Sequence, residues 1–415
     1  MMRSLILGAI ASFVSALPGL SQGAELLDAF DLALRNDRGY LNAQAEERLG
    51  QHDANRARLS YLPTLFIDQG RNALENSSRT TIQVIQPLMD VEKYASFKES
   101  PTRAAYAQAG LDVKEIDLAK RLYASYGSLV RSNALRKLAL LEAQALDRQA
   151  QRAQRRFDLG YSSVMDITLA KVQYSQAMAR YQALQNDIQS ARQKLFSLTG
   201  ATYAQAQGQP AEDLDASLLS ANVQLDSTTN VEHPLVRQAK EQLQLAESGL
   251  LRAKSSYLPQ VNLIVRNSQY GDLSEQYHGV QISFPTGVSF YGVQATQRAM
   301  VDQERARRAL EEVQEQLRLD LESTELALKV NAQELEFRAF AVRDSEKNVA
   351  ATEKAYEAGI VKASDVVNAI LANFDVRRQR LLLLMSMADQ QLLHSLSRGM
   401  TPRLALAKLS FFFKE

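Results

Sequence analysis

Apolar positions recur at helical spacing along two very long stretches of the chain, roughly residues 102–157 and 293–357. In the second stretch the main apolar line advances in steps of three, four and four, an eleven-residue repeat of about 3.67 residues per turn that lets a helix run nearly straight. A second line beside it indicates packing against neighbours on two sides, although an ordinary coiled coil or bundle would show the same stripes. The first line is Leu310, Val313, Leu317, Leu321, Thr324, Leu328, Ala332, Leu335 and Ala339, and the second is Leu319, Leu326, Val330 and Phe337.

The predicted helix lengths are related to one another. A helix over 293–357 would be about 98 Å long, whereas helices over 26–59 and 162–199 would be about 51 and 57 Å. Two short helices stacked end to end would therefore match one long helix. The second half of the chain repeats the relation, with short helices expected near 232–255 and 362–398.

Alternation of apolar and polar residues predicts two strand pairs, each after the tetrapeptide "SYLP". After Pro259, Val261, Leu263 and Val265 alternate with Asn262, Ile264 and Arg266, and Val280 and Ile282 alternate with polar residues on the return. The first copy shows the same pattern around residues 65–84. One apolar face and one mostly polar face suit a sheet between lipid and water, but a soluble hairpin that caps a helical bundle fits equally well. Four strands do not close a barrel, so a membrane interpretation requires oligomerisation.

The two halves of the chain are duplicates. "SYLP" begins at Ser60 and again at Ser256, 196 residues later, and "RRFDLGYSSVMDITLA" matches "KAYEAGIVKASDVVNAI" at a spacing of 199. Ordered agreement at two distant sites with nearly equal spacing indicates an internal duplication. Each half is then a helix, a strand pair, a long helix, a tight turn and a helix.

The N-terminus predicts export. A basic start, the apolar run "SLILGAIASFVSAL" and small residues before Ala24 are the parts of a secretory signal peptide, and about 14 apolar residues are too few to span a bilayer. The duplication and this segment together divide the chain. We expect a signal peptide at 1–23; a first repeat at 24–200, with strands near 64–70 and 79–88, a long helix at 102–157 and a turn at 158–163; a linker at 201–230; a second repeat at 231–399, with strands near 260–268 and 277–285, a long helix at 293–357 and a turn at 358–363; and a C-terminal tail at 400–415.

Composition excludes several classes of function. The chain carries 48 Lys plus Arg and 47 Asp plus Glu, so electrostatics do not favour a nucleic-acid partner. It has no cysteine, which excludes disulfides and thiolate metal sites, and its four histidines lack metal-ligand spacing. No nucleophile motif or phosphate-binding loop is present, so we expect no enzyme activity and no cofactor or metal.

The order of these motifs resembles that of the TolC-like outer-membrane efflux and secretion channels. The resemblance extends from Ala24 to about Gly399 and depends on both "SYLP" segments, on "QPLMD" at 86–90 and on the paired "FDLGYSSVMD" and "YEAGIVKASD" turns. It implies a mainly α fold with a small β part: a homotrimer whose long α-helical barrel crosses the periplasm and continues as a β-barrel in the outer membrane, with four strands per subunit. It also implies two protein partners, a periplasmic adaptor and an inner-membrane pump.

The resemblance assigns roles to residues at the two turns. The turns become the periplasmic tip that docks an adaptor, and the glycines suit the left-handed residue at a helix end. Beyond them lies a gate, in which Asp365 faces the pore and Tyr356 holds the inner helices closed. Three carboxylates brought together by threefold symmetry would attract cations. The tip residues are Leu159, Gly160, Ala358 and Gly359; the gate residues are Tyr356, Asp365, Asn368 and Asp166; and the residues where helix gives way to strand are Tyr61, Pro63, Tyr257 and Pro259.

Plainer interpretations stay open. Asp166 ends a Ser163-x-x-Asp166 capping box and could serve only to start its helix, and Asp365 lies near a helix N-terminus as well. Tyr356 could be a packing residue. The chain also departs from the family pattern, with Asn368 in place of a second gate aspartate and Val361 in place of an arginine. Pro101 either starts the long helix or kinks it.

The function expected from this sequence is a passive exit duct for multidrug efflux or type I secretion. The alternatives are a periplasmic adaptor, which should carry a single helical hairpin within soluble β domains, and an exported structural coiled coil without a pore. The duplicated strands and turns count against both alternatives.

Overall fold

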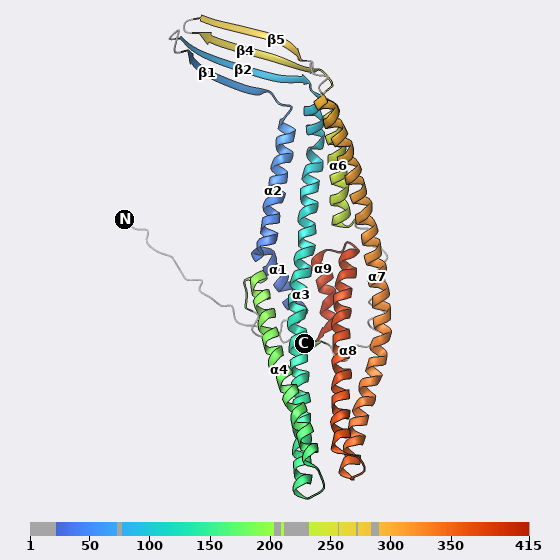
Figure 1. The fold of residues 1–415 in the computed structure, drawn as a ribbon. Helices are drawn as coiled ribbons and strands as arrows, with labels where there is room; N and C mark the ends of the chain where they lie inside the picture. The colour runs from blue at the N-terminus through green and yellow to red at the C-terminus, as the bar shows by residue number, and fades with distance from the viewer. Residues whose placement is uncertain are drawn as a thin grey trace, which may run out of the picture.

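A computed structural model describes residues 22–72, 77–202, 209–210, 232–255, 257–270, 273–283 and 290–414 of the chain. It is an elongated bundle of helices with a small antiparallel sheet at one end (Figure 1). The predicted fold class, mainly helical with a small β part, is confirmed. Most of the predicted signal peptide and linker lies outside the described residues.

The first half of the chain runs from short helices through two strands to the longest helix and back. Its elements are α1 (Gln22–Asn36), α2 (Arg38–Leu59), β1 (Thr64–Asn72), β2 (Ser77–Met89), α3 (Val91–Asp158) and α4 (Val164–Thr199), followed by the two-residue strand β3 (Gln209–Pro210). The second half repeats this order. Its elements are α6 (Pro234–Ser255), β4 (Gln260–Tyr270), β5 (Leu273–Ser283), α7 (Phe290–Glu357) and α8 (Ala363–Ser397), and the chain ends with α9 (Pro402–Ala407), the 3₁₀ helix η1 (Lys408–Phe412) and β6 (Phe413–Lys414), which pairs with β3.

The strand expected over 277–285 lies at Leu273–Ser283, and three larger differences from the sequence expectation concern helices and the C-terminal tail. The helix expected over 26–59 is broken at Asp37, because the carboxylate of Asp37 accepts the backbone N–H of Tyr40 and starts a new helix. The long helix expected from 102 begins instead at Val91, because Asp90 caps it through the N–H of Lys93. Pro101 therefore lies inside α3. The tail expected over 400–415 is folded, and Leu406, Leu409 and Phe412 are buried in the core.

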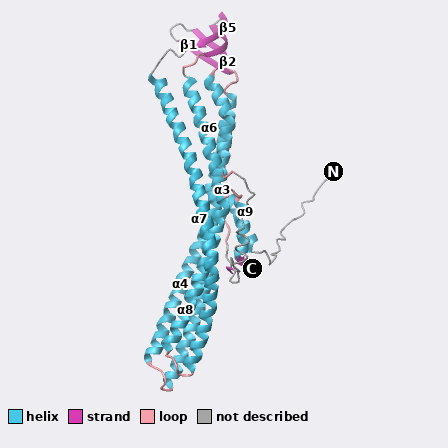
Figure 2. Cartoon of the chain, turned by 90° about the vertical axis from the view of Figure 1, so that its right-hand side faces the viewer, coloured by secondary structure: helices cyan, strands magenta, loops and turns pink. Residues whose placement is uncertain are grey.

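Short helices stack end to end along α3. α2 continues the line of α4, and Asn36, the last residue of α1, donates a side-chain hydrogen bond to the carbonyl of Thr199 at the end of α4, at 2.8 Å. α6 continues the line of α8 in the same way on the other side (Figures 1 and 2). The lower half is thus ordered α4, α3, α8, α7, and the upper half α2, α3, α6, α7. The stacking expected from helix lengths is what the chain forms.

The sheet has the strand order β1-β2-β4-β5, with each neighbouring pair antiparallel. Side chains of Leu65, Ile67, Val280 and Ile282 lie on one face and are more than half exposed. The opposite face carries polar groups, such as Thr81 and Ser268, whose hydroxyls lie 3.3 Å apart. An exposed apolar face opposite a polar one suits lipid on one side and water on the other.

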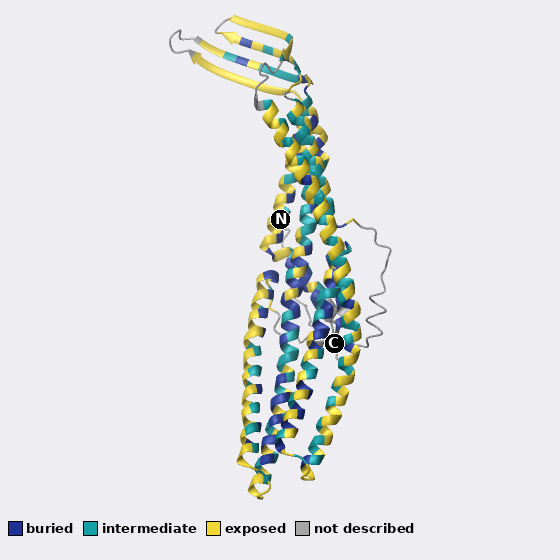
Figure 3. Ribbon diagram, turned by 45° about the vertical axis from the view of Figure 1, so that its right-hand side comes forward, coloured by how far each residue is buried: buried dark blue, intermediate teal, exposed yellow. Residues whose placement is uncertain are grey.

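The main core lies at mid-height, where α1, α9 and η1 pack against the bundle (Figure 3). Tyr126, Phe30 and Met387 are fully buried there. A second core nearer the two turns joins α3, α4 and α8 through Leu146, Ala170 and Val366. None of the described helices contains a segment that is both long and apolar enough to cross a membrane.

Candidate functional site

The two turns at the end of the bundle furthest from the sheet have the same backbone geometry. Gly160 and Gly359 adopt φ values of 81° and 77°, a left-handed conformation that costs other residues steric strain. The N–H of Tyr161 reaches back to the carbonyl of Arg156, and the N–H of Ile360 to that of Ala355, each at 2.8 Å. These bonds close the same helix-ending motif twice. The turn geometry expected from the duplicated sequence is present in both halves.

The turns expose large apolar side chains. Leu159 is 70% exposed, Tyr161 75%, Met165 79% and Ile360 78%. Ala358, beside Gly359, is also exposed. A cluster of this kind at the tip of a bundle is unusual for a surface that faces only water and typical of a binding surface. The docking role predicted for these turns stays a prediction, and the exposed apolar side chains support it.

Both aspartates after the turns cap their own helices. Asp166 accepts hydrogen bonds from the N–H of Ser163 at 3.2 Å and the hydroxyl of Ser162 at 3.0 Å. Asp365 accepts the N–H of Lys362 at 3.0 Å although no serine or threonine precedes it. The capping interpretation therefore has direct geometry behind it in both halves. Asp365 is exposed even so, with oxygen lone pairs left for ions or water.

Asn368 lies one helical turn after Asp365 and is exposed on the same side of α8. Val361, where an arginine was expected from the resemblance, is half-buried against the lower core. The exposed face at the start of α8 thus carries one carboxylate and one amide. Its pore role is a prediction that depends on how copies of the chain assemble.

Tyr356 is buried and is held by a residue that sequence analysis missed. The guanidinium of Arg156, from the end of α3, lies 4.6 Å from the centre of the Tyr356 ring and donates a hydrogen bond to the Tyr356 carbonyl. One turn along, Arg152 pairs with Glu353 at 2.9 Å. These contacts connect the end of α3 to the end of α7 and so join the two turns. In the sequence, Arg156 is only one of two basic residues in the last turn of a helix, where cations are favoured anyway.

A second contact joins the two halves of the chain farther from the turns. The carboxylate of Glu142 on α3 is 2% exposed and accepts from Arg180 of α4 at 2.5 Å and from Arg378 of α8 at 3.2 Å. Two cations around one buried carboxylate offset its desolvation only while both remain in place. Glu142 thus connects the helical hairpin α3–α4 with the hairpin α7–α8.

The residues between helix and strand form compact crossings. Tyr61 donates its hydroxyl to the carbonyl of Leu88 at 3.4 Å, and Gln86 donates to the carbonyl of Tyr61 at 3.1 Å. Pro63 and Pro259 each stand directly before a strand. The other tyrosine, Tyr257, is 48% exposed. A half-exposed tyrosine at such a crossing suits a membrane interface.

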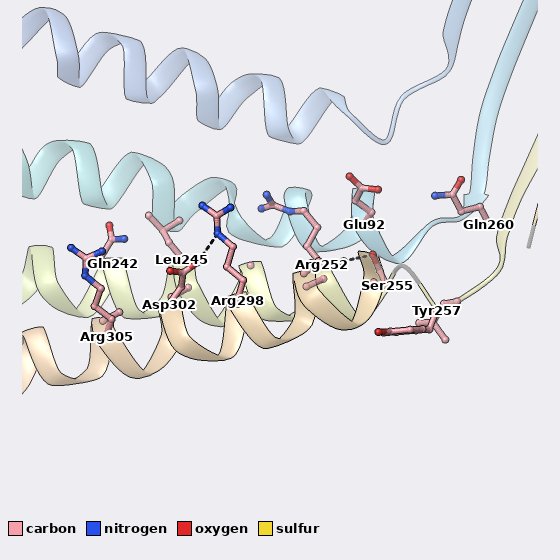
Figure 4. A pocket seen from close by; sticks show the side chains of 18 of the residues that line it. Glu92, Gln242, Leu245, Arg252, Ser255, Tyr257, Gln260, Arg298, Asp302 and Arg305 are labelled. Atoms are coloured by element: carbon pink, nitrogen blue, oxygen red, sulfur yellow. Dashed lines mark hydrogen bonds and ion pairs between the residues drawn. The ribbon is translucent and has the colours of Figure 1, made fainter. Parts of the chain in front are cut away.

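A groove of about 1240 Å³ lies where α3, α6 and α7 meet the ends of β4 and β5 (Figure 4). Two of its arginines are paired within the chain, Arg252 with Glu99 and Arg298 with Asp302 at 4.0 Å. We assign no ligand to this groove. Across the described ranges, no three His, Asp or Glu side chains come together as a metal site would require.

Comparisons with known proteins identify what this chain resembles. Residues 29–201 match the model of a family described as outer membrane efflux protein. The proteases secretion protein PrtF of Dickeya chrysanthemi is 25% identical over 300 residues, which cover 65% of this chain and 62% of that protein. The alkaline protease secretion protein AprF of Pseudomonas aeruginosa is 22% identical over 412 residues, covering 89% and 83% respectively.

Solved structures share the fold over nearly the whole chain. The outer membrane protein VceC of Vibrio cholerae superposes with a TM-score of 0.79 at 14% identity and covers 91% of this chain and 96% of its own. CusC superposes with a TM-score of 0.77 at 14% identity, covering 91% and 92%.

Proposed function

We propose that the chain is the exit duct of a tripartite export system and works as a homotrimer, because it resembles the TolC-like channels and its residues 29–201 match the outer membrane efflux protein family. The protein is located in the outer membrane, with its helical part in the periplasm. The duct carries cargo passively from an inner-membrane pump and a periplasmic adaptor to the exterior. No step of this function needs a catalytic group.

The observation that carries the proposal concerns the wall, which is the layer formed by the helices and the sheet. Along its whole length this layer ends on each of two sides in an element that has no further neighbour within the described part of the chain. In the sheet the outer strands are β1 and β5. In the helical part the outer elements are α2 and α4 on one side and α7 on the other. An unpaired strand edge in lipid leaves backbone groups without partners, so the sheet must be closed by other copies. Three copies of four strands would give a barrel of twelve, wide enough to leave a channel.

The side chains on the α7 edge support closure by neighbouring subunits. Leu326 is 65% exposed, Val330 51% and Phe337 72%, all on the outer helix of the wall. These residues belong to the second apolar line of the sequence, which predicted a neighbour on a second side of this helix. The partner that covers this line in the proposed trimer is the α4 or α2 edge of the next copy.

The apolar tip is the proposed docking surface for the adaptor. Leu159, Tyr161 and Ile360 would be covered by the adaptor, with Gly160 and Gly359 allowing close approach of the backbone. The gate lies directly above. There Arg156 and Tyr356 hold the end of α3 against the end of α7, and the three copies of Asp365 would favour cations.

Sequence relatives favour a secreted protein as the cargo. Both PrtF and AprF carry names that refer to protease secretion. We therefore place type I secretion ahead of drug efflux for this chain. Deletion of the gene tests the choice: loss of a secreted protein from the medium supports secretion, whereas sensitivity to drugs without such loss supports efflux.

Mass measurement tests the duct itself. The protein is extracted from the outer membrane in detergent and weighed by light scattering, then inserted in planar bilayers. A particle of three chains that conducts ions is expected. A soluble monomer, or a trimer without conductance, would contradict the proposal and return the chain to an adaptor or a structural protein.

A further inference from the structure

Two joints connect the stacked helices: one at the start of α2, above α4, and one at the start of α6, above α8. They differ in chemistry although they occupy equivalent places in the duplicated halves. Asp37 starts α2 and His233 starts α6, 196 residues apart, the same spacing as the two "SYLP" segments. Both residues are N-caps by geometry. Asp37 accepts the N–H of Tyr40 at 2.8 Å, and His233 Nδ1 accepts the N–H of Leu235 at 3.1 Å.

The Asp37 joint is held by permanent charges. Arg121 of α3 donates to both carboxylate oxygens of Asp37, at 3.0 and 3.1 Å. Burial opposes ionisation of Asp37, but the hydrogen bonds from Arg121 and from the amides of Tyr40 and Gly39 outweigh it, so the pKa of this carboxyl lies below its usual value. The Asp37 cap therefore stays charged at both neutral and mildly acidic pH.

The His233 joint depends on a neutral ring. The ring is 9% exposed and forms two hydrogen bonds: Nδ1 accepts from Leu235, and the ring donates to the carbonyl of Leu396 at the end of α8. Since Nδ1 is the acceptor, the proton must be on Nε2. A second proton on Nδ1 removes the acceptor and places a positive charge at the N-terminus of α6, where the helix dipole is unfavourable to it.

The surroundings of His233 also oppose protonation. Burial is the largest effect, Lys120 of α3 adds a nearby positive charge, and together they lower the pKa of His233, although its hydrogen bond to Leu396 acts the other way. Glu232, its neighbour in sequence, is paired with Lys240 instead. The neighbouring residues Lys120 and Arg121 therefore act on different caps: Lys120 lies near the neutral His233, and Arg121 binds the anionic Asp37.

We propose that His233 makes the joint between α8 and α6 acid-sensitive: a proton taken up at Nδ1 releases the N-terminus of α6, while the equivalent Asp37 joint stays closed. The sign follows from the lowered pKa. Above the ordinary histidine pKa of about 6.5 the joint keeps its full stability, and this is lost as pH falls from there through the pKa of the folded state. The hairpin α7–α8 is then loosened at its upper end and the hairpin α3–α4 is not. The joint behaves this way whether or not the chain conducts.

A second histidine in the same region provides a matched control. His394 Nδ1 lies 3.2 Å from the hydroxyl of Thr324, which gives its own proton to the carbonyl of Asp320 at 2.7 Å. With the Thr324 proton assigned to that carbonyl, His394 Nδ1 is the donor, and this bond survives protonation. Burial and Arg398 lower the pKa of His394, Glu325 raises it and Lys408 lowers it further.

Hydrogen exchange of the full chain in detergent tests the proposal. Exchange at pH 7.5 and 5.5 is compared after correction for the intrinsic pH dependence of amide exchange. In the wild type, peptides over residues 232–240 should exchange about fivefold faster at pH 5.5, the effect of one lost N-cap. His233→Asn keeps an acceptor that does not titrate and should abolish the response, whereas His394→Gln should keep it. Peptides over 36–44 should show no response.

Two outcomes would overturn the inference. One is an equal acid response in the wild type and in His233→Asn, which would place the sensitive group elsewhere. The other is an equal response of peptides 232–240 and 36–44, which would mean that acid loosens both joints through the bundle as a whole. Because neither measurement requires ion conduction, failure here is separate from failure of the proposed duct.

Discussion

Removal of the Arg156 side chain should weaken the closed state of the gate. In the structure this guanidinium donates to the Tyr356 carbonyl and stacks over the Tyr356 ring at 4.6 Å. A hydrogen bond from a charged group contributes about 1.5 kcal/mol, and a cation–π contact at a half-buried site about 1 kcal/mol. Arg156→Ala should therefore cost about 2.5 kcal/mol per chain, or about 70-fold in the ratio of closed to open forms.

Two further variants separate the parts of this contact. Tyr356→Leu keeps the carbonyl and removes the ring, so it should shift the ratio by only about fivefold, the share of the cation–π contact. Arg155→Ala removes an exposed arginine next to Arg156 and should leave the ratio unchanged. Open probability in planar bilayers measures all three. If Arg156→Ala opens the channel no more often than Arg155→Ala does, the contact does not hold the gate and the reasoning fails.

Three other predictions concern the same region. Gly160→Ala and Gly359→Ala should each lower the free energy of unfolding by about 1 kcal/mol. The added methyl group meets free space or an ordinary contact, so the loss comes only from backbone strain at a positive φ. A melting temperature, measured by circular dichroism, that equals that of the wild type would contradict this. Glu142→Ala leaves two arginines without their shared carboxylate and should cost about 3 kcal/mol, with Glu142→Gln losing less; equal melting of the two would count against the buried ion pairs. Asp365→Ala should reduce cation preference in planar bilayers as well as removing the cap of α8, and unaltered selectivity would leave Asp365 with the capping role alone.

Local patterns in the sequence were sufficient to predict that the helices, the strands and the turns exist and in which order they follow. Period-two alternation after each "SYLP" predicted the strand pairs, because a strand with lipid on one face and water on the other must alternate. The glycines of the two turns were found because only a residue without a side chain adopts a positive φ without strain. The duplication then extended each conclusion from one half to the other. The predicted resemblance to the TolC-like channels is confirmed by comparison with known proteins.

Local patterns failed where a boundary depended on one capping side chain or on distant packing. Pro101 suggested a helix start because proline fits the first turn of a helix, but Asp90 caps the chain earlier and α3 continues through the proline. Asp37 broke a helix that was expected to be continuous, because one carboxylate bond to Tyr40 suffices to begin a new one.

The sequence by itself therefore determined the elements, their duplication and the residues at the turns, because each depends on interactions within a few positions of the chain. Only the tertiary structure decided which side chains meet between helices that are distant in the sequence. Arg156 and Tyr356 are 200 residues apart, and Glu142 and Arg378 are 236 apart. Periodicity indicates that a helix face is covered but not by what, so these contacts, and the neutral histidine where its duplicate has an aspartate, became visible only when the halves were packed together.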